Sequence, residues 1–238
     1  MKKLQKITRT SLTERAHQSI RRYILDGHLN TESRLTEDFF AQHLGISKSP
    51  VREALNTLQG EGLLRIEPRR GAFLYRFSPK EIRDLYELRE ELEVFAAGTA
   101  MITPQLVEDL QQSVARSGDY LRENDQARYI EEDIHFHETI VGATGNVELC
   151  RVFANLQNKL WLCRCQTYRL TSPDTPESHR EISEALRDHD RVRAQEVTRR
   201  HIRFVRDALL RSVEEKQNGK KKAQPADESE LACEVSGV

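Results

Sequence analysis

The chain has 238 residues, with 37 Lys and Arg against 38 Asp and Glu, and 6% aromatic residues. This length allows a small domain and a larger one, each with its own core. No apolar run reaches membrane length, and the four cysteines lack the paired spacing of a disulfide framework or zinc ribbon. These features exclude a membrane-spanning protein and a disulfide scaffold, and we expect a soluble, cytoplasmic protein with free thiols.

The charge is distributed unevenly along the chain. Residues 1–78 hold 14 basic and 8 acidic residues, a net +6, whereas residues 79–214 hold 19 and 25, a net −6. The first segment therefore attracts polyanions and the second does not. Residues 1–11 form a basic arm, and residues 215–238 lack apolar periodicity and are predicted to be disordered.

Three helices are predicted near the N-terminus. The first spans about 13–26, with an inner stripe formed by Ala16, Ile20, Tyr23 and Ile24. The second spans 36–44 and is capped by Thr36. Gly45 tolerates the left-handed conformation that ends this helix, and Ser47 or Ser49 can cap the third.

The third helix has two distinct faces. Val51, Leu55 and Leu58 repeat at helical spacing and predict a buried face. Lys48 and Arg52 lie elsewhere, near the helix N-terminus, where cations and backbone N–H groups suit a DNA major groove. The alternative is an ordinary capped surface helix whose charges are solvated.

The residues that follow favour the DNA-binding interpretation. Residues 62–75 read as a strand, a tight turn from Pro68 to Gly71 and a second strand, which together form a wing. Arg69 and Arg70 lie at its tip, where they can contact phosphates or the minor groove.

Residues 12–76 resemble the winged helix-turn-helix of GntR-type transcription regulators. The resemblance rests on four motifs: Arg34-Leu-Thr-Glu37, Leu44-Gly-Ile-Ser-Lys-Ser-Pro-Val-Arg-Glu-Ala-Leu55, Glu61-Gly-Leu63 and Pro68-Arg-Arg-Gly71. It implies a set of DNA-contacting residues: Arg34, Ser47, Lys48, Ser49, Arg52, Arg69 and Arg70. Two positions depart from the family pattern, since Lys48 stands where arginine is frequent and Asp38 where some members have a DNA-contacting arginine. Lysine is a point donor, so Lys48 is better suited to phosphate than to bidentate base contact.

Beyond a boundary near Phe77, the sequence contains helix signals and no strand signal. Ser78 and Pro79 begin the first of six predicted helices, which span about 79–101, 104–123, 126–144, 146–169, 177–190 and 193–214. Most connections are short, so neighbouring helices should run antiparallel as a bundle. The predicted organisation is thus mainly α, with a winged helix-turn-helix at 1–77, an all-α six-helix bundle at 78–214 and a tail at 215–238.

Four polar residues fall on predicted inward faces of three helices: Asp133, His137, His179 and His201. Asp133 and His137 are spaced i and i+4, so they can present an oxygen and a nitrogen to one metal ion. Each histidine alone is more simply read as a hydrogen-bonded core residue. Together the four form a pattern typical of a metal site, for which Zn, Ni, Mn and Fe are candidates.

The same residues resemble the FCD effector domain of the FadR branch of GntR regulators, in its six-helix VanR-type arrangement. By this resemblance Asp133, His137, His179 and His201 are the metal ligands. Arg89 also faces inward, on a stripe with Leu85 and Leu92. It either pairs with a neighbouring glutamate or Asp133, or binds the carboxylate of an effector.

The sequence therefore predicts a ligand-responsive, homodimeric transcription regulator, specifically a repressor. A small organic acid would bind the metal and Arg89, and the dimer would bind an inverted-repeat operator in double-stranded DNA. The alternative is a metal-dependent hydrolase or lyase fused to a nucleic-acid-binding module, although no general base is identifiable. A nucleoid-type structural protein is a weaker alternative, which the inward polar residues disfavour.

Overall fold

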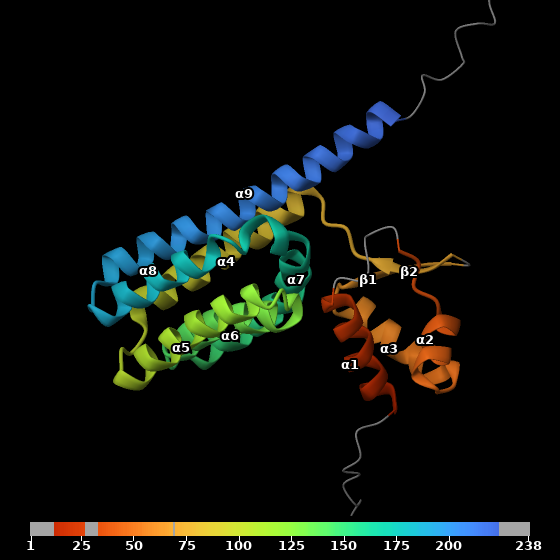
Figure 1. Ribbon diagram of the computed structural model, residues 1–238, viewed down its shortest axis with the longest axis horizontal. Helices are drawn as coiled ribbons and strands as arrows, with labels where there is room; N and C mark the ends of the chain where they lie inside the picture. The colour runs from red at the N-terminus through yellow and green to blue at the C-terminus, as the bar shows by residue number, and fades with distance from the viewer. Residues whose placement is uncertain (1–11, 27–32, 69, 224–238) are drawn as a thin grey trace, which may run out of the picture.

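The computed structural model describes residues 12–26, 33–68 and 70–223. These residues form two parts, a small N-terminal domain of helices α1 to α3 with a β-hairpin, and a bundle of helices α4 to α9 (Figure 1). The predicted mainly α fold, with a winged helix-turn-helix followed by a six-helix bundle, is confirmed. The N-terminal arm, Arg69 and residues 224–238 lie outside the described residues.

The N-terminal domain contains helices α1 (Leu12–Leu25), α2 (Glu37–Leu44) and α3 (Lys48–Gly60). Thr36 caps α2 by accepting a hydrogen bond from the Phe39 backbone N–H, and Gly45 ends it in the left-handed conformation at φ 65°. Ser47 is the N-cap of α3, but its side chain makes no capping hydrogen bond, contrary to the prediction. Its hydroxyl group therefore stays available at the exposed end of this helix.

Strands β1 (Leu64–Glu67) and β2 (Gly71–Leu74) pair antiparallel and form the wing. Leu35 adds a short bridge to β2, with its N–H donating to the Ala72 carbonyl at 2.8 Å. The sequence did not predict this third segment. Gly71 has φ 102°, and a Cβ there would lie 3.0 Å from the Leu35 carbonyl oxygen, so the close approach of Leu35 requires glycine.

The bundle consists of α4 (Pro79–Thr99), α5 (Pro104–Arg122), α6 (Gln126–Gly142), α7 (Val147–Thr171), α8 (Thr175–Arg187) and α9 (Arg191–Ala223). A capping box begins α4, because Ser78 and Glu81 exchange side-chain to backbone hydrogen bonds. Tyr75 of the linker donates a hydrogen bond to the same Glu81 carboxylate at 2.7 Å. The start of the bundle is thereby tied to the end of the wing.

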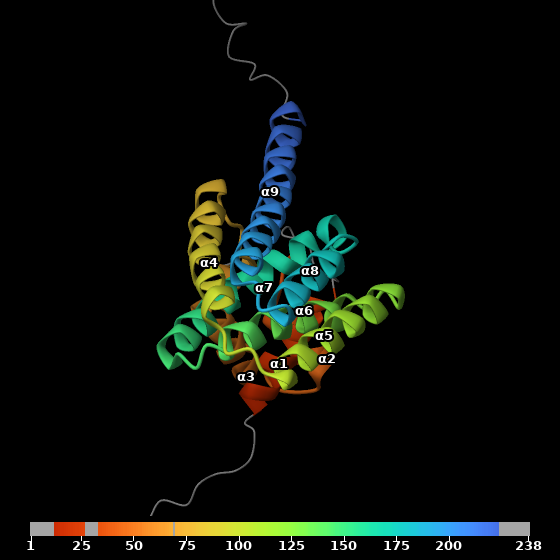
Figure 2. The same ribbon diagram turned by 90° about the vertical axis from the view of Figure 1, so that its left-hand side faces the viewer.

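Helices α4 and α9 lie side by side and project together from the rest of the bundle (Figure 2). Helix α9 continues to Ala223, so residues 215–223 are helical where the sequence predicted disorder. The basic run Lys220 to Lys222 lacks apolar periodicity, but lysine has high intrinsic helix propensity and here extends a helix already begun. No helix in the described ranges is both long and apolar enough to cross a membrane.

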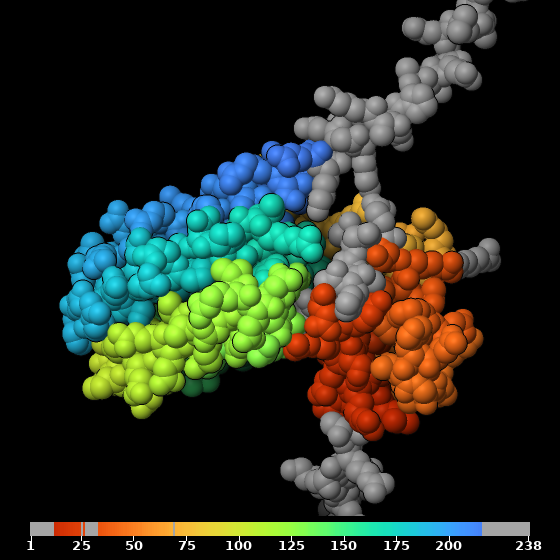
Figure 3. Space-filling model, in the orientation of Figure 1, coloured from red at the N-terminus to blue at the C-terminus, as the bar shows by residue number. Residues whose placement is uncertain are grey.

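The N-terminal domain packs against the bundle, where the red α1 meets the green α6 in Figure 3. Arg21 of α1 lies over the ring of Trp161 of α7, with its Cζ 5.1 Å from the ring centroid. Its neighbour Arg22 forms an ion pair with Glu131 of α6 at 3.1 Å. One hydrophobic cluster continues across this junction, from Ile20 in α1 to Trp161 in α7.

Candidate metal centre and DNA interface

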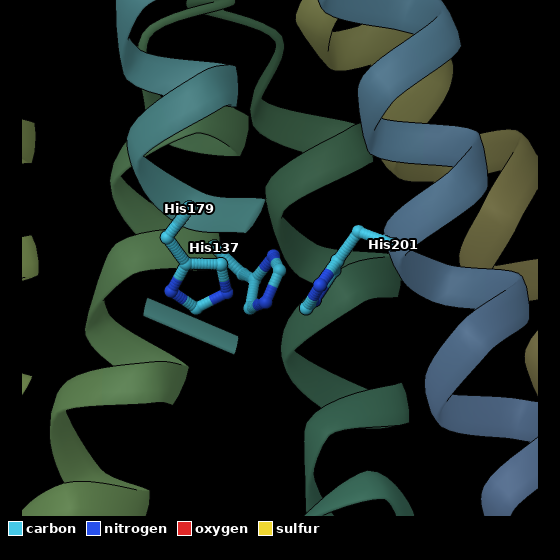
Figure 4. Close-up of side chains that lie close together, drawn as sticks. All are labelled: His137, His179 and His201. Atoms are coloured by element: carbon cyan, nitrogen blue, oxygen red, sulfur yellow. The ribbon is translucent and has the colours of Figure 1, made fainter. Parts of the chain in front are cut away.

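Three histidines converge inside the bundle from three different helices (Figure 4). His137 comes from α6, His179 from α8 and His201 from α9, and each is at most 2% exposed. One ring nitrogen of each histidine can be chosen such that all three lie within 4.8 Å of one another. The helical spacing that placed these residues on inward faces thus correctly predicts their convergence.

Two of these rings have no hydrogen-bond partner among the described residues. Both nitrogens of His179 and both nitrogens of His201 are buried and unpaired. A buried polar group without a partner costs about 1–3 kcal/mol, and hydrogen bonds to described residues do not offset this cost for His179 or His201. A divalent cation would satisfy one nitrogen of each ring, and borderline imidazole donors suit Zn, Ni or Fe(II). The residues present therefore fit a metal ion.

Asp133 adds a carboxylate to this cluster. Its Oδ1 lies 3.6 Å from Nε2 of His179 and 4.0 Å from Nε2 of His137. Its Oδ2 accepts a hydrogen bond from Nε of Arg164 on α7, which the sequence analysis did not identify. One oxygen thus faces the histidines, while the other is held by an arginine.

Arg89 forms the ion pair that the sequence left open as an alternative. Its Nε donates to Glu93 Oε1 at 2.6 Å, and its Nη2 lies 2.9 Å from Nε2 of His137. Glu93 Oε2 in turn lies 2.6 Å from Nδ1 of His137, which fixes the ring. Arg89 and a metal ion would compete for the same His137 nitrogen, so metal binding requires the guanidinium to move. The spacing of Arg89 and Glu93, i and i+4, was visible in sequence.

The electrostatics of the cluster favour metal binding at neutral pH. Burial, helped by the neighbouring His137, lowers the pKa of His179 to about 3. Burial likewise lowers the pKa of His201 well below its ordinary value. For Asp133, burial opposes the charge, but the positive charge of Arg164 outweighs it and holds the pKa below its usual range. The two imidazoles are therefore neutral and the carboxylate is ionised, which are the forms that bind metal.

A cavity lies beside this cluster, lined by Arg89, Asp133 and His201. Arg164 also lines it, and its Nη2 has no hydrogen-bond partner in the described part of the chain. Three threonines also line it, Thr167 and Thr171 of α7 and Thr175 of α8, and each hydroxyl donates a hydrogen bond to the backbone carbonyl four residues earlier. The sequence analysis missed these residues, although Leu160, Arg164, Thr167 and Thr171 form a recognisable inward stripe of α7.

The predicted DNA-contacting residues that the structure describes are all exposed: Arg34, Ser47, Lys48, Ser49, Arg52 and Arg70. Three of these residues are cations that form ion pairs with acidic residues, and the sequence did not predict these pairs. Lys48 pairs with Asp38 at 2.5 Å, and Arg70 pairs with Glu67 at 2.6 Å. Arg52 donates from Nε and Nη2 to the two oxygens of Glu37, both at 2.8 Å.

Comparison with known proteins agrees with this architecture. Residues 12–74 match the bacterial regulatory proteins of the gntR family, and residues 84–204 match the FCD domain. An uncharacterized HTH-type transcriptional regulator from Streptomyces ambofaciens is 29% identical over 196 residues, which cover 81% of this chain and 82% of that protein. The gluconate operon transcriptional repressor of Bacillus licheniformis is 30% identical over 154 residues, 63% of each chain.

The fold is shared with solved structures. E. coli McbR/YncC superposes with a TM-score of 0.70 at 22% identity, covering 85% of this chain and 99% of that one. The helix-turn-helix with its wing and the all-helical second domain define a DNA-binding transcription regulator. The chain belongs to the GntR family and carries an FCD domain. This family consists of regulators, so the alternative of a metal-dependent hydrolase or lyase is set aside.

Proposed function

We propose that this regulator is a cytoplasmic homodimeric repressor that binds an inverted-repeat operator and responds to a small organic acid held in the bundle beside a divalent metal ion. The observation that carries the proposal is the buried cluster of His137, His179 and His201, in which the nitrogens of His179 and His201 make no hydrogen bond to a described residue and Nε2 of His179 lies 3.6 Å from the carboxylate of Asp133. Burying such groups together destabilises the fold unless a ligand satisfies them.

The metal ligands in this proposal are Asp133, His137, His179 and His201. When bound, the ion supplies a fixed positive charge and open coordination positions for ligand oxygens. Glu93 orients His137 by accepting from its Nδ1. Arg164 orients Asp133 by donating a hydrogen bond from its Nε to Oδ2.

The cavity has a volume of about 20 Å³, which is room for about one water molecule, so an effector can enter it only if lining side chains move. The polar groups of its lining suit a hydroxylated carboxylic acid. Arg164 offers an unpaired Nη2 to a carboxylate, and the lining threonines, whose hydroxyls already donate to backbone carbonyls, can accept from an effector hydroxyl. Arg89 lines the same cavity and could bind the effector carboxylate after leaving His137. The name of the gluconate operon repressor points to a compound of this class, since gluconate is a polyhydroxy acid.

Helix α7 offers a route from the cavity to the DNA-binding domain. Arg164 faces the cavity, and Trp161, one turn earlier, lies under Arg21 of α1. An effector that displaces Arg164 would also displace α7, and with it the surface that α1 contacts. The effector can change DNA binding only if it has different affinities for two relative arrangements of the DNA-binding domain and the bundle.

A binding experiment tests this function. Operator fragments are first selected from a genomic library, and affinity is then measured with and without a panel of hydroxylated acids, for metal-loaded and chelator-treated protein. We expect one acid to weaken operator binding at least tenfold, and only for the metal-loaded protein. Equal affinity for all fragments would contradict the specific regulator, and indifference to every acid would contradict the effector cavity.

A further inference from the structure

A groove lies beside the segment that leads from β2 into α4 (Figure 1). Its volume is about 410 Å³, which falls within the range of small-molecule sites, about 300–1,000 Å³. Tyr75 and Phe77 of this segment and Leu85 and Leu88 of α4 give the groove apolar walls. Leu88 is large and apolar, yet it is 45% exposed, so much of its side chain is left uncovered beside the groove.

The two acidic residues of the lining have partners within the protein. Asp84 forms an ion pair with Lys80 at 2.5 Å. Glu81 accepts hydrogen bonds from Ser78 on one carboxylate oxygen and from the Tyr75 hydroxyl on the other, and these bonds lower the pKa of Glu81. A cation entering the groove would therefore meet carboxylates that are already paired.

Lys159 of α7 supplies a positive charge to the lining. Its charge adds to the hydrogen bonds that lower the pKa of Glu81, but Lys159 forms no ion pair or hydrogen bond with any residue that the structure describes. An ammonium group without a direct partner, beside apolar walls, suits a ligand that has one negative charge and an apolar body.

We propose that this groove is a second ligand site, separate from the cavity in the bundle, and that it binds an amphipathic monocarboxylic acid. The carboxylate pairs with Lys159, and the apolar body lies against Tyr75, Phe77 and Leu88. Because the walls come from the linker, α4 and α7, a bound acid contacts both domains. This inference goes beyond the proposed function and does not depend on metal binding by the histidine cluster.

The probe that tests the site is 1-naphthoate, with 1-naphthalenemethanol as its uncharged counterpart, and ligand-observed NMR on the full chain measures binding. For ligands of this size we expect a dissociation constant of about 1 mM or below. Lys159→Gln should weaken binding of the acid about threefold or more, as for loss of an exposed ion pair, and should leave binding of the alcohol unchanged. The control is Arg151→Gln, which removes an exposed cation about two turns earlier on α7.

A second variant tests the apolar walls. Leu88→Ser should weaken binding of both the acid and the alcohol about threefold or more, because the apolar body loses a surface that shields it from water. The matched control is Leu170→Ser at the end of α7, since Leu170 is 47% exposed and Leu88 is 45% exposed. This control should bind both ligands as the wild type does.

Removal of metal by a chelator distinguishes the groove from the bundle cavity. Binding of 1-naphthoate should be the same for metal-loaded and chelator-treated protein. Loss of binding after chelation would place the probe in the bundle and overturn the groove site. The site is also overturned if the wild type shows no saturable binding of the acid at millimolar concentration, or if either Lys159→Gln or Leu88→Ser binds the acid with wild-type affinity.

Discussion

The carboxylate of Glu93 lies between two groups of the candidate metal centre: one oxygen is 2.6 Å from Nδ1 of His137 and the other accepts from Nε of Arg89 at 2.6 Å. Glu93 therefore fixes the His137 ring with Nε2 toward Asp133 and Arg89. Replacing Glu93 by Gln should lower metal affinity about 10- to 100-fold, the usual effect of losing a partner of a metal-binding histidine. Competition with a calibrated chelator measures this, with Glu91→Gln on the exposed side of α4 as the control.

Variants of the proposed metal ligands and of a nearby exposed histidine should differ strongly in metal content. Protein purified without a His-tag or chelator should retain close to one divalent ion per chain. His137→Ala and His179→Ala should each sharply reduce that content, whereas His135→Ala should not, because His135 is exposed on the other side of α6. Elemental analysis decides the matter. An effect of His135→Ala as large as that of His137→Ala would exclude the four-ligand site.

Replacing Arg164 and replacing Arg89 should affect effector binding in different ways. Arg164→Lys keeps a positive charge near Asp133 but loses the planar fork, so effector affinity should fall at least tenfold, as measured by calorimetry. Arg89→Lys should affect metal binding as well, because Arg89 lies 2.9 Å from the His137 nitrogen. If Arg164→Lys binds effector as the wild type does, Arg89 alone holds the carboxylate.

Two cations of α3, Lys48 and Arg52, pair with acidic residues of α2, and variants at these positions should change DNA binding in different ways. Asp38→Asn frees Lys48 and should raise affinity for all DNA sequences, with a steeper salt dependence.

Arg52→Ala should instead relax sequence preference, at a cost of about 1–3 kcal/mol for the base pair concerned. Arg69→Ala and Arg70→Ala at the wing should each weaken binding uniformly and reduce the salt slope by about 1. Binding-site selection at two salt concentrations separates these outcomes.

Acidic pH should destabilise the metal-free bundle. The pKa of folded His179 is about 3, whereas an unfolded histidine titrates near about 6.5, so the unfolded state binds more protons between these values. Stability is then fully present above about pH 6.5 and falls with decreasing pH, by up to about 1.4 kcal/mol per pH unit for each such histidine. His201, whose pKa is also lowered, acts in the same direction.

Urea unfolding of chelator-treated protein at pH 7 and pH 5 measures this dependence. His179→Gln removes one titrating group and should flatten the difference. Equal stability of the wild type at the two pH values would contradict the burial of neutral imidazoles.

Helical periodicity explains how much of the candidate site was predictable. It fixes which residues of a helix face inward, so His137, His179 and His201 could be assigned to the core before their helices were placed. Periodicity does not predict which residue a buried charged side chain pairs with. Arg164 was missed for this reason, since its link to Asp133 depends on how α6 packs against α7.

The same distinction holds for the fold. The caps at Thr36 and Ser78 are local, and the sequence placed both helix starts to within a residue. The bridge from Leu35 to Ala72 joins segments far apart in sequence and is too short to leave a pattern. The pairing of Lys48 with Asp38 likewise depends on the angle between two helices, which composition does not encode.

The fluorescence of Trp161 can report on the contact between the two domains. It is the single tryptophan of the chain, it is 1% exposed, and it lies beneath Arg21 at the seam between the two domains. A ligand that draws α7 away from α1 will bring water to the indole and shift its emission to longer wavelength. The motion between the domains can therefore be followed by fluorescence in unlabelled protein, on the time scale of mixing and without any DNA present.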